Sequence, residues 1–164
     1  MATLAELDLL PRLALLIDTL QQRMTQSGIA TGFGPNAGAR SARKQQLLYE
    51  QGRKRLTDNI WVPVDPATRV GIITNATPLK SPHCRHIDHD GAIGSAACDI
   101  WIMVDGYPAL TKYDEGYDLY GELGRVGEAI GLVWGGRFHS IHDIDHFELF
   151  DFRSLQLAPE QEEV

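Results

Sequence analysis

All six histidines of the chain fall in two short clusters, His83, His86 and His89 and then His139, His142 and His146. The aspartates that lie between or beside these clusters include Asp99, Asp143 and Asp145. Histidine and carboxylate are the ligands that a catalytic zinc ion prefers, and such a site takes three protein ligands and leaves a fourth position open. Any single histidine here could be an ordinary surface or core residue. The two clusters together predict that distant segments meet around one metal ion.

The second cluster ends in Asp143-Ile144-Asp145-His146. A carboxylate three residues before a histidine ligand can lie beside the metal without binding it. From there it can take a proton from the attacking water and return it to the leaving amine. Asp-x-x-His alone is a weak motif, because short acidic-histidine strings are common on solvated surfaces. Its context strengthens it, since Trp-Gly-Gly precedes it at 134–136 and the strand-like residues 147–150 follow it.

Five motifs follow one another along residues 38–150. They are Gly38-Ala39-Arg40-Ser41 with the helical segment 46–53, Ile73-Thr74-Asn75-Ala76 with Pro78, Ser81-Pro82-His83, Ala96-Ala97-Cys98-Asp99-Ile100, and Trp134-Gly135-Gly136 with the segment 143–148. In this order they resemble the zinc peptidases that include D-alanyl-D-alanine carboxypeptidases and L-alanyl-D-glutamate endopeptidases. The latter occur in phage endolysins and in bacterial wall-remodelling enzymes. Five ordered motifs are far more specific than any one of them.

The resemblance implies a role for each matching residue. The implied metal ligands are His83, Asp99 and His146, with zinc as the metal. Asp143 is implied as the general base, and Arg40 as the residue that holds a substrate carboxylate or the oxyanion, for which its two-pronged donor geometry is suited. A surface arginine at a helix start is the alternative for Arg40. Ser81 is expected to hydrogen-bond near the ligand or the substrate.

The sequence departs from the family between the first two ligands. Relatives space them as His-x6-Asp, whereas 16 positions separate His83 from Asp99, so a segment of about nine residues is inserted. His86 and His89 lie in this insert and stay open as alternatives to His83. The unbroken string from Thr74 to His83 favours His83. We expect the insert to bulge beside the cleft, as a lid or a substrate contact. A second departure is Arg137, where relatives commonly carry aspartate.

The two cysteines bracket the insert, because Cys84 follows His83 and Cys98 precedes Asp99. If both ligands share one metal, the cysteines also come close. A disulfide could then close the loop and stabilise it by roughly 3 kcal/mol in the loop-entropy model. Two reduced thiols are the alternative, which a cytosolic location favours. A cysteine ligand to zinc is a further alternative, although the spacing is not that of a zinc knuckle.

Three helices are predicted from apolar periodicity. The first starts near Pro11, stops before Gly28 and has the apolar stripe Leu13, Leu16, Ile17, Leu20 and Met24. Ser41 can cap a second helix that runs to about Arg55, with an inward face of Leu47, Leu48 and Leu56. Asp118 can cap a third, which repeats Leu119, Leu123, Val126 and Ile130 before Gly131 ends it.

Strands are expected over residues 70–74, 97–104 and 147–152. Helices segregated from a small antiparallel sheet make an α+β domain, and the resemblance implies the D,D-peptidase/Hedgehog-like version of that class. Residues 1–158 are expected to form a single peptidase domain, and residues 159–164 an acidic, frayed tail. Strands or strand edges would then carry the metal ligands.

Composition limits the setting in which the protein acts. The N-terminal apolar stretch is broken by Glu6, Asp8, Arg12 and Asp18, so we expect no export signal. No run approaches the roughly 20 apolar residues that a membrane span needs. A formal net charge of −7 argues against nucleic acid as a partner and against electrostatic capture by an anionic wall.

These observations together predict a monomeric zinc peptidase that cuts the stem peptide of bacterial peptidoglycan. A chain without a wall-binding module resembles phage endolysins that cut L-alanyl-D-glutamate. It is expected in the cytoplasm, reaching the wall after release or on a phage particle. A D-alanyl-D-alanine carboxypeptidase would use the same residues. A catalytically silent wall-binding module, or a structural or signalling domain, stays open as well.

Overall fold

The computed structural model describes residues 1–57 and 60–159. Within them the helices are α1 (Pro11–Gln26), α2 (Ala42–Glu50) and α3 (Tyr120–Ala129). Short 3₁₀ turns are η1 (Leu4–Glu6), η2 (Pro78–Lys80), η3 (Tyr117–Leu119), η4 (Gly135–Arg137) and η5 (Phe152–Ser154). The predicted acidic tail lies outside the described residues except for Pro159. No described helix is long and apolar enough to cross a membrane.

The strands form small antiparallel sheets. One sheet orders β1 (Ala30–Gly32), β7 (Trp101–Val104) and β8 (Tyr107–Pro108). A second orders β6 (Ala97–Asp99), β10 (His146–Leu149) and β9 (Leu132–Trp134). A third orders β11 (Gln156–Leu157), β4 (Arg85–Ile87) and β5 (Ile93–Ser95), and β2 (Arg53–Thr57) pairs with β3 (Ile60–Pro63). The predicted α+β class is confirmed, with several small sheets in place of one.

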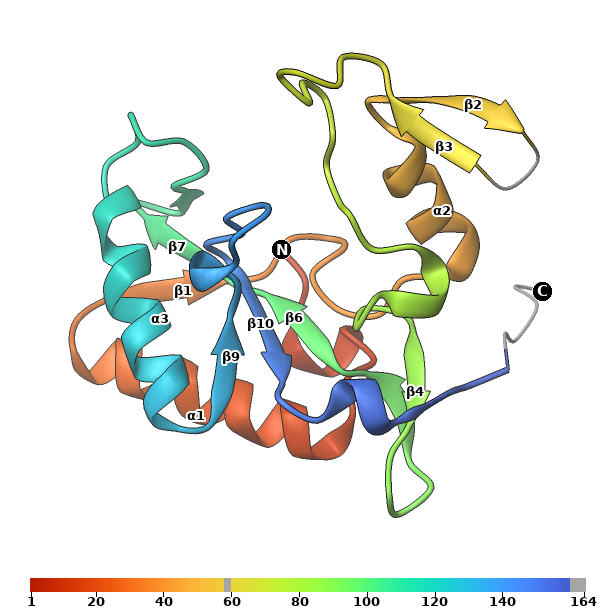
Figure 1. Cartoon of the computed structure of the whole chain (residues 1–164). Coiled ribbons are helices and arrows are strands. Elements are labelled where there is room, and N and C mark those ends of the chain that lie inside the picture. Colours follow the sequence, from red (N-terminus) through yellow and green to blue (C-terminus); the bar gives the residue numbers. More distant parts are fainter. Residues whose placement is uncertain (58–59, 160–164) are drawn as a thin grey trace.

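The hydrophobic core lies between α1, α3 and the strands. The α1 helix begins with Pro11 at its first turn and buries Leu13, Ile17, Leu20 and Met24, as the periodicity predicts. Figure 1 shows α1 and α3 beside the sheet that contains β9 and β10. Phe147 of β10 is fully buried among them. This packing fixes β10, the strand that begins with His146.

The predicted third helix is present, but its N-terminus differs. Asp118 lies in η3 and does not cap α3, which starts at Tyr120 without a side-chain cap. The buried Tyr120 hydroxyl instead accepts a hydrogen bond from Ile102 N at 3.2 Å, and this contact ties the helix start to β7. Gly131 follows the helix with φ +97°, the left-handed conformation expected after a helix end.

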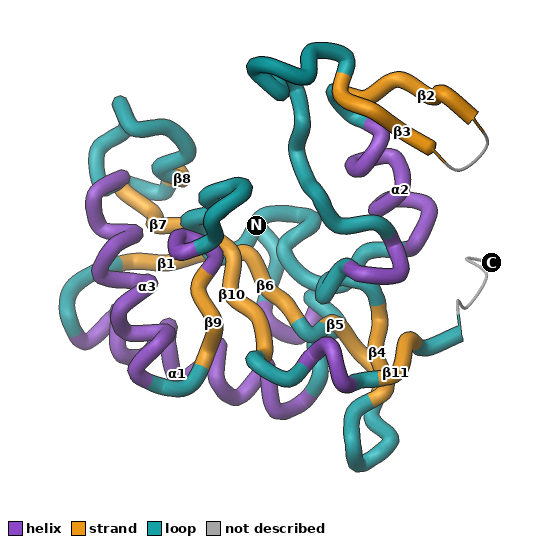
Figure 2. The backbone as a smooth tube through the Cα atoms, viewed as in Figure 1, coloured by secondary structure: helices purple, strands orange, loops and turns teal. Residues whose placement is uncertain are grey.

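Residues 42–80, which we call the lobe, depart most from the sequence-based predictions. Ser41 does cap α2, accepting from Lys44 N at 3.2 Å, but the helix ends at Glu50 and not near Arg55. Leu47 and Leu56 are more than half exposed instead of facing inward. Residues 70–74 form no strand, because they lie in the loop that returns from β3 to η2 (Figure 2). Figure 1 shows α2 and the β2–β3 hairpin set apart from the other helices and sheets.

The other two predicted strands are present with changed bounds. Residues 97–104 divide into β6 and β7, with Ile100 between them. The last predicted strand ends at Leu149, and the chain turns into η5 at Phe152. Both differences follow from the sheets, because β6 pairs with β10 while β7 pairs with β1.

Candidate metal centre

The pairing of β6 with β10 brings two predicted ligands together. His146 is the register partner of Asp99, and Phe147 is the partner of Cys98. Directly opposed residues of an antiparallel pair have their Cβ atoms about 4.5–5.5 Å apart. Two residues that are 47 positions apart in the sequence therefore share one face of a sheet. His146 Nδ1 lies 3.1 Å from Asp99 Oδ1.

His83 reaches the same point from the turn that follows η2. Its backbone oxygen accepts a hydrogen bond from Arg40 N at 2.9 Å, and its backbone N–H donates to Ser81 Oγ at 3.3 Å. Its ring lies 3.2 Å from Asp99 Oδ1 and 3.2 Å from His146 Nδ1, measured from Nε2. Two main-chain hydrogen bonds thus hold a buried ring against the strand pair.

The three atoms form a nearly equilateral triangle with edges of 3.1, 3.2 and 3.2 Å. Zinc binds histidine nitrogen and carboxylate oxygen at about 2.0–2.2 Å, so two ligands of a regular tetrahedron lie about 3.3–3.5 Å apart. The observed edges fall within a few tenths of an ångström of that spacing. His83, Asp99 and His146 therefore form a group that can hold a metal ion.

Hydrogen bonds on the far side of each ring fix which nitrogen faces the group. Gly38 O lies 2.9 Å from His83 Nδ1. A carbonyl oxygen can only accept, so Nδ1 carries the proton and the neutral ring presents the Nε2 lone pair. The Nε2 of His146 lies 3.0 Å from a carboxylate oxygen of Glu148 and donates to it in the same way. When the His146 ring is neutral, two ring lone pairs and one carboxylate oxygen converge, which is the donor set of a metal site.

The electrostatics favour a cation at this point. Burial alone would lower the pKa of His146, but hydrogen bonds with Asp99 and Glu148 outweigh it and raise the pKa to about 10. Burial likewise would raise the pKa of Asp99, but its interactions with His83, His146 and Arg40 hold that pKa well below its ordinary value. Burial lowers the pKa of His83. A proton or a metal ion can supply the positive charge that the group favours.

Glu148 is the functional residue that the sequence reasoning missed. It is buried, and it lies on the same face of β10 as His146 because side chains two apart on a strand point the same way. A carboxylate two residues after a predicted strand-borne ligand was the signal available in the sequence. Arg40 contacts the carboxylate of Asp99, because its Nη2 forms an ion pair with Asp99 Oδ2.

The group lies in a cleft with a volume of about 1000 Å³. Asp143, Arg40 and Ser81 line the same cleft, and Asp143 stands outside the ligand group. Gly135 lets the segment 143–146 approach, because a Cβ there would lie 2.4 Å from Asp143 O. Asp143 N in turn donates to Gly135 O at 3.1 Å. The structure therefore brings all six predicted site residues to one cleft.

The remaining histidines do not join the ligand group. His139 and His142 are exposed residues of the cleft wall. His86 lies on β4, where its ring packs edge-on against Phe152, and His89 follows β4 and approaches Asp151. No described residue of the insert lines the cleft, so the expected lid is not there. The insert instead forms the β4–β5 hairpin.

A salt bridge fastens that hairpin to α1. Arg12 donates to Asp88 at 2.8 Å and to Asp151 at 2.9 Å, so one side chain joins α1, the insert and the segment after β10. Leu157 of β11 pairs with His86 on the other edge. The insert therefore supports the part of the chain outside the lobe, which we call the body, and does not cover the site.

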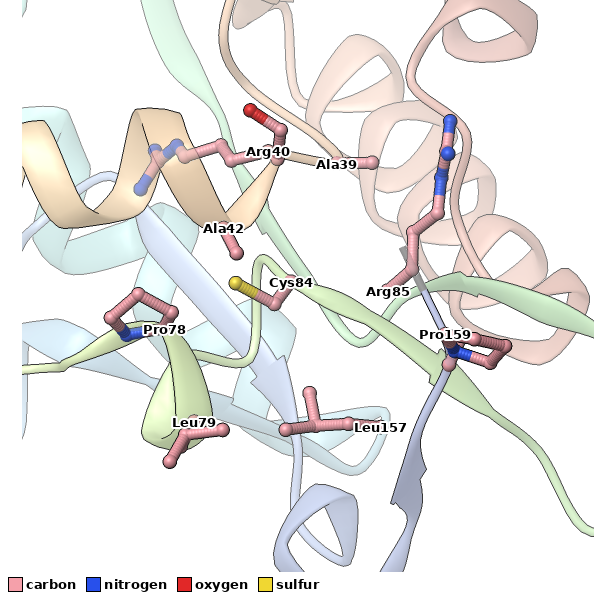
Figure 3. A pocket seen from close by; sticks show the side chains of 11 residues that line it. Ala39, Arg40, Ala42, Pro78, Leu79, Cys84, Arg85, Leu157 and Pro159 are labelled. Carbon is pink, nitrogen blue, oxygen red and sulfur yellow. The ribbon is translucent and has the colours of Figure 1, made fainter. Parts of the chain in front are cut away.

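The cysteines do not form a disulfide, and both are buried thiols. Burial raises the pKa of the Cys98 thiol well above its ordinary value. Cys84 borders a second cavity of about 440 Å³, on the other side of the turn that carries Arg40. Figure 3 shows its sulfur pointing toward Ala42 and Pro78. Neither cysteine is part of the ligand group.

Comparisons with known proteins add no family to this description. No protein-family model matches the chain, and no curated protein sequence matches it. Function therefore has to be argued from the chemistry of the site, because a fold class alone does not define one.

Proposed function

We propose that this protein is a zinc peptidase that hydrolyses the stem peptide of bacterial peptidoglycan. One observation carries the proposal: three convergent ligand atoms, spaced for a tetrahedral ion, lie in a large cleft that Asp143 also lines. The ordered motifs between residues 38 and 150 supply the substrate class by resemblance. By the same resemblance, the fold is proposed to be of the D,D-peptidase/Hedgehog-like kind.

Each residue of the proposed site then has a chemical role. His83, Asp99 and His146 would hold the ion, and three protein ligands are the number usual for a catalytic zinc site. When bound, the ion would supply Lewis acidity. Asp143 takes a proton from the attacking water and returns it to the leaving amine. A structural metal site has no need of such a carboxylate outside the ligand group.

Arg40 and Ser81 complete the proposed site. Arg40 orients the ligand Asp99 through their ion pair, and as a cleft residue it is placed to meet a carboxylate of the substrate. Ser81 is fully buried and holds the backbone of His83. Both residues therefore act on ligand geometry, with substrate contact as the further role proposed for Arg40.

The preferred reaction is L-alanyl-D-glutamate cleavage by a monomeric, endolysin-like enzyme that reaches the wall after release or on a phage particle. A D-alanyl-D-alanine carboxypeptidase is the alternative, because it would need the same ligands and base. A silent wall-binding module is the second alternative. The position of Asp143 favours an enzyme over that module.

Digestion of purified muropeptides, followed by mass analysis, tests the proposal. We expect a new amino terminus at glutamate, loss of activity with a chelator and recovery with zinc. Asp143→Asn should keep the metal and lose turnover by about a hundredfold or more, as removal of a general base does. Asp118→Asn makes the same chemical change at an exposed position outside the cleft and is the control. Release of terminal D-alanine would select the carboxypeptidase, and full activity in metal-free protein would exclude a metallopeptidase.

A further inference from the structure

We propose that the lobe, residues 42–80, is a docking surface for an anionic lipid membrane. The first observation is charge. The lobe holds seven of the chain's 15 lysines and arginines but only three of its 22 aspartates and glutamates, which gives it a formal net charge of +4 and the rest of the chain −11. An acidic protein therefore carries one strongly basic region.

Several cations of the lobe form no internal ion pair in the described part of the chain. In the body, Arg12, Arg85, Arg125 and Arg137 each pair with a carboxylate. In the part of the lobe that the structure describes, no ion pair is formed by Arg43, Lys54 or Lys80, which are all exposed. Cations that lack an internal partner are available to an external anion.

The charges of α2 also oppose the stability of that helix. Arg43 and Lys44 lie in its first turn, which has no acidic residue, while Glu50 lies at its end without a basic residue. A helix macrodipole favours acidic side chains at the N-terminus and basic ones at the C-terminus. Stability of the helix therefore does not explain why these charges stand where they do.

Exposed apolar side chains accompany the cations. Among the described residues, 14 large apolar side chains are exposed, and seven belong to the lobe: Leu47, Leu56, Ile60, Val64, Val70, Ile73 and Leu79. None of the buried core residues comes from the lobe. Leu56 lies one residue before the end of β2 and Ile60 begins β3, and Lys54 stands two residues before Leu56 on the same strand.

This combination fits a bilayer with anionic headgroups better than a soluble polyanion. Lysine and arginine are attracted to the negative surface, and apolar side chains enter the boundary between headgroups and acyl chains. A soluble polyanion would need the cations only. A second copy of the chain would bring two basic lobes together if it docked through the same face.

The test is co-sedimentation with vesicles of equimolar phosphatidylglycerol and phosphatidylcholine, compared with phosphatidylcholine alone. The wild-type protein should bind the anionic vesicles and release in high salt. Lys54→Glu should weaken binding at low salt by on the order of tenfold. Leu56→Ser should weaken it by a similar factor, because one leucine no longer enters the apolar boundary.

Matched controls lie on the acidic body. Lys112→Glu and Leu110→Ser make the same chemical changes at exposed positions there and should leave vesicle binding unchanged. Muropeptide cleavage in solution should be equal in all four variants, so failure of the docking proposal is separate from failure of the peptidase proposal.

Three outcomes would overturn the assignment. Equal vesicle binding by the lobe variants and the body variants would exclude the lobe. Binding to soluble polyphosphate that Leu56→Ser leaves intact would indicate a polyanion as the partner. Concentration-dependent dimerisation of the wild type, lost in Leu56→Ser, would assign the apolar face to a second copy.

Discussion

The body and the lobe are stabilised by different kinds of contact. The body encloses one continuous hydrophobic core, which α1, α3 and the strands around the metal group share. In the described part of residues 42–80, the only buried residue is the polar Gln45, whose side chain donates to Ala76 O at 2.9 Å. Backbone and polar contacts hold the lobe: Val64 N donates to Gly52 O, and Arg53 donates to Asn75.

The body and the lobe contribute different parts of the candidate site. Metal ligands must keep their mutual geometry to within fractions of an ångström, and His83, Asp99 and His146 all come from the body. The lobe supplies one wall of the cleft through residues such as Lys44 and Ile73. Segments with few buried apolar contacts open at low free-energy cost. We therefore expect a rigid site beside a wall that can move.

The largest expected effect comes from removing a ligand. His83→Ala should abolish metal binding, because it removes one of the three ligands and no other histidine of the described chain lies close enough to replace it. His86→Ala and His89→Ala should keep about one metal per chain, since both rings lie outside the group. Zinc titration of the three variants measures this. Metal loss in His86→Ala with retention in His83→Ala would move the site to the insert.

Truncating one side chain in the body and one in the lobe tests whether both regions depend on a hydrophobic core. Phe147→Ala should lower the free energy of unfolding by about 3–5 kcal/mol, because it removes a fully buried ring and leaves a cavity. Leu56→Ala should change it by less than about 0.5 kcal/mol, the range usual for exposed positions. Urea unfolding of both variants checks the pair. A large loss in Leu56→Ala would show that the lobe has a core of its own.

The same division explains where sequence reasoning succeeded. Apolar periodicity assumes that a helix faces a core, which holds for α1, whose predicted stripe is buried except for the partly buried Leu16. The described part of the lobe offers no core to face, so Leu47 and Leu56, predicted to face inward, are exposed, and the strand predicted over residues 70–74 does not form. Apolar residues there do not report burial.

The site was predictable in its residues but not in its supports. The six residues predicted from type and order all line one cleft. The register that opposes Asp99 and His146 depends on long-range pairing, which a single sequence does not encode locally. The backbone partner of His83, Gly38 O, became visible only with the fold. Glu148, the partner of His146, had a signal in the sequence, because it is a carboxylate two residues after a predicted ligand.

The contribution of Glu148 to metal affinity can be measured by substitution. Glu148→Ala should weaken metal affinity by about 10–100-fold, the usual cost of losing a partner that orients a ligand. Glu148→Gln keeps an acceptor for His146 Nε2–H and should recover most of that loss. In metal-free protein the ¹⁵N shifts of the His146 ring report its protonation, and its pKa of about 10 should fall in Glu148→Ala because one of the hydrogen bonds that raise it is lost. Equal affinity in all three proteins would remove Glu148 from the site.

The smallest expected effect concerns the cap that begins the lobe. Ser41 accepts from Lys44 N, and its loss in Ser41→Ala should destabilise α2 by about 1 kcal/mol. If the lobe opens independently, amide exchange over residues 42–57 should speed up about fivefold, which is that free energy expressed as an equilibrium constant. The thermal midpoint of the body should not move. Ser41→Asp restores a good cap and should restore slow exchange. Faster exchange that extends into α1 and β10 would mean that lobe and body unfold together, and the metal site would then share the lobe's low stability.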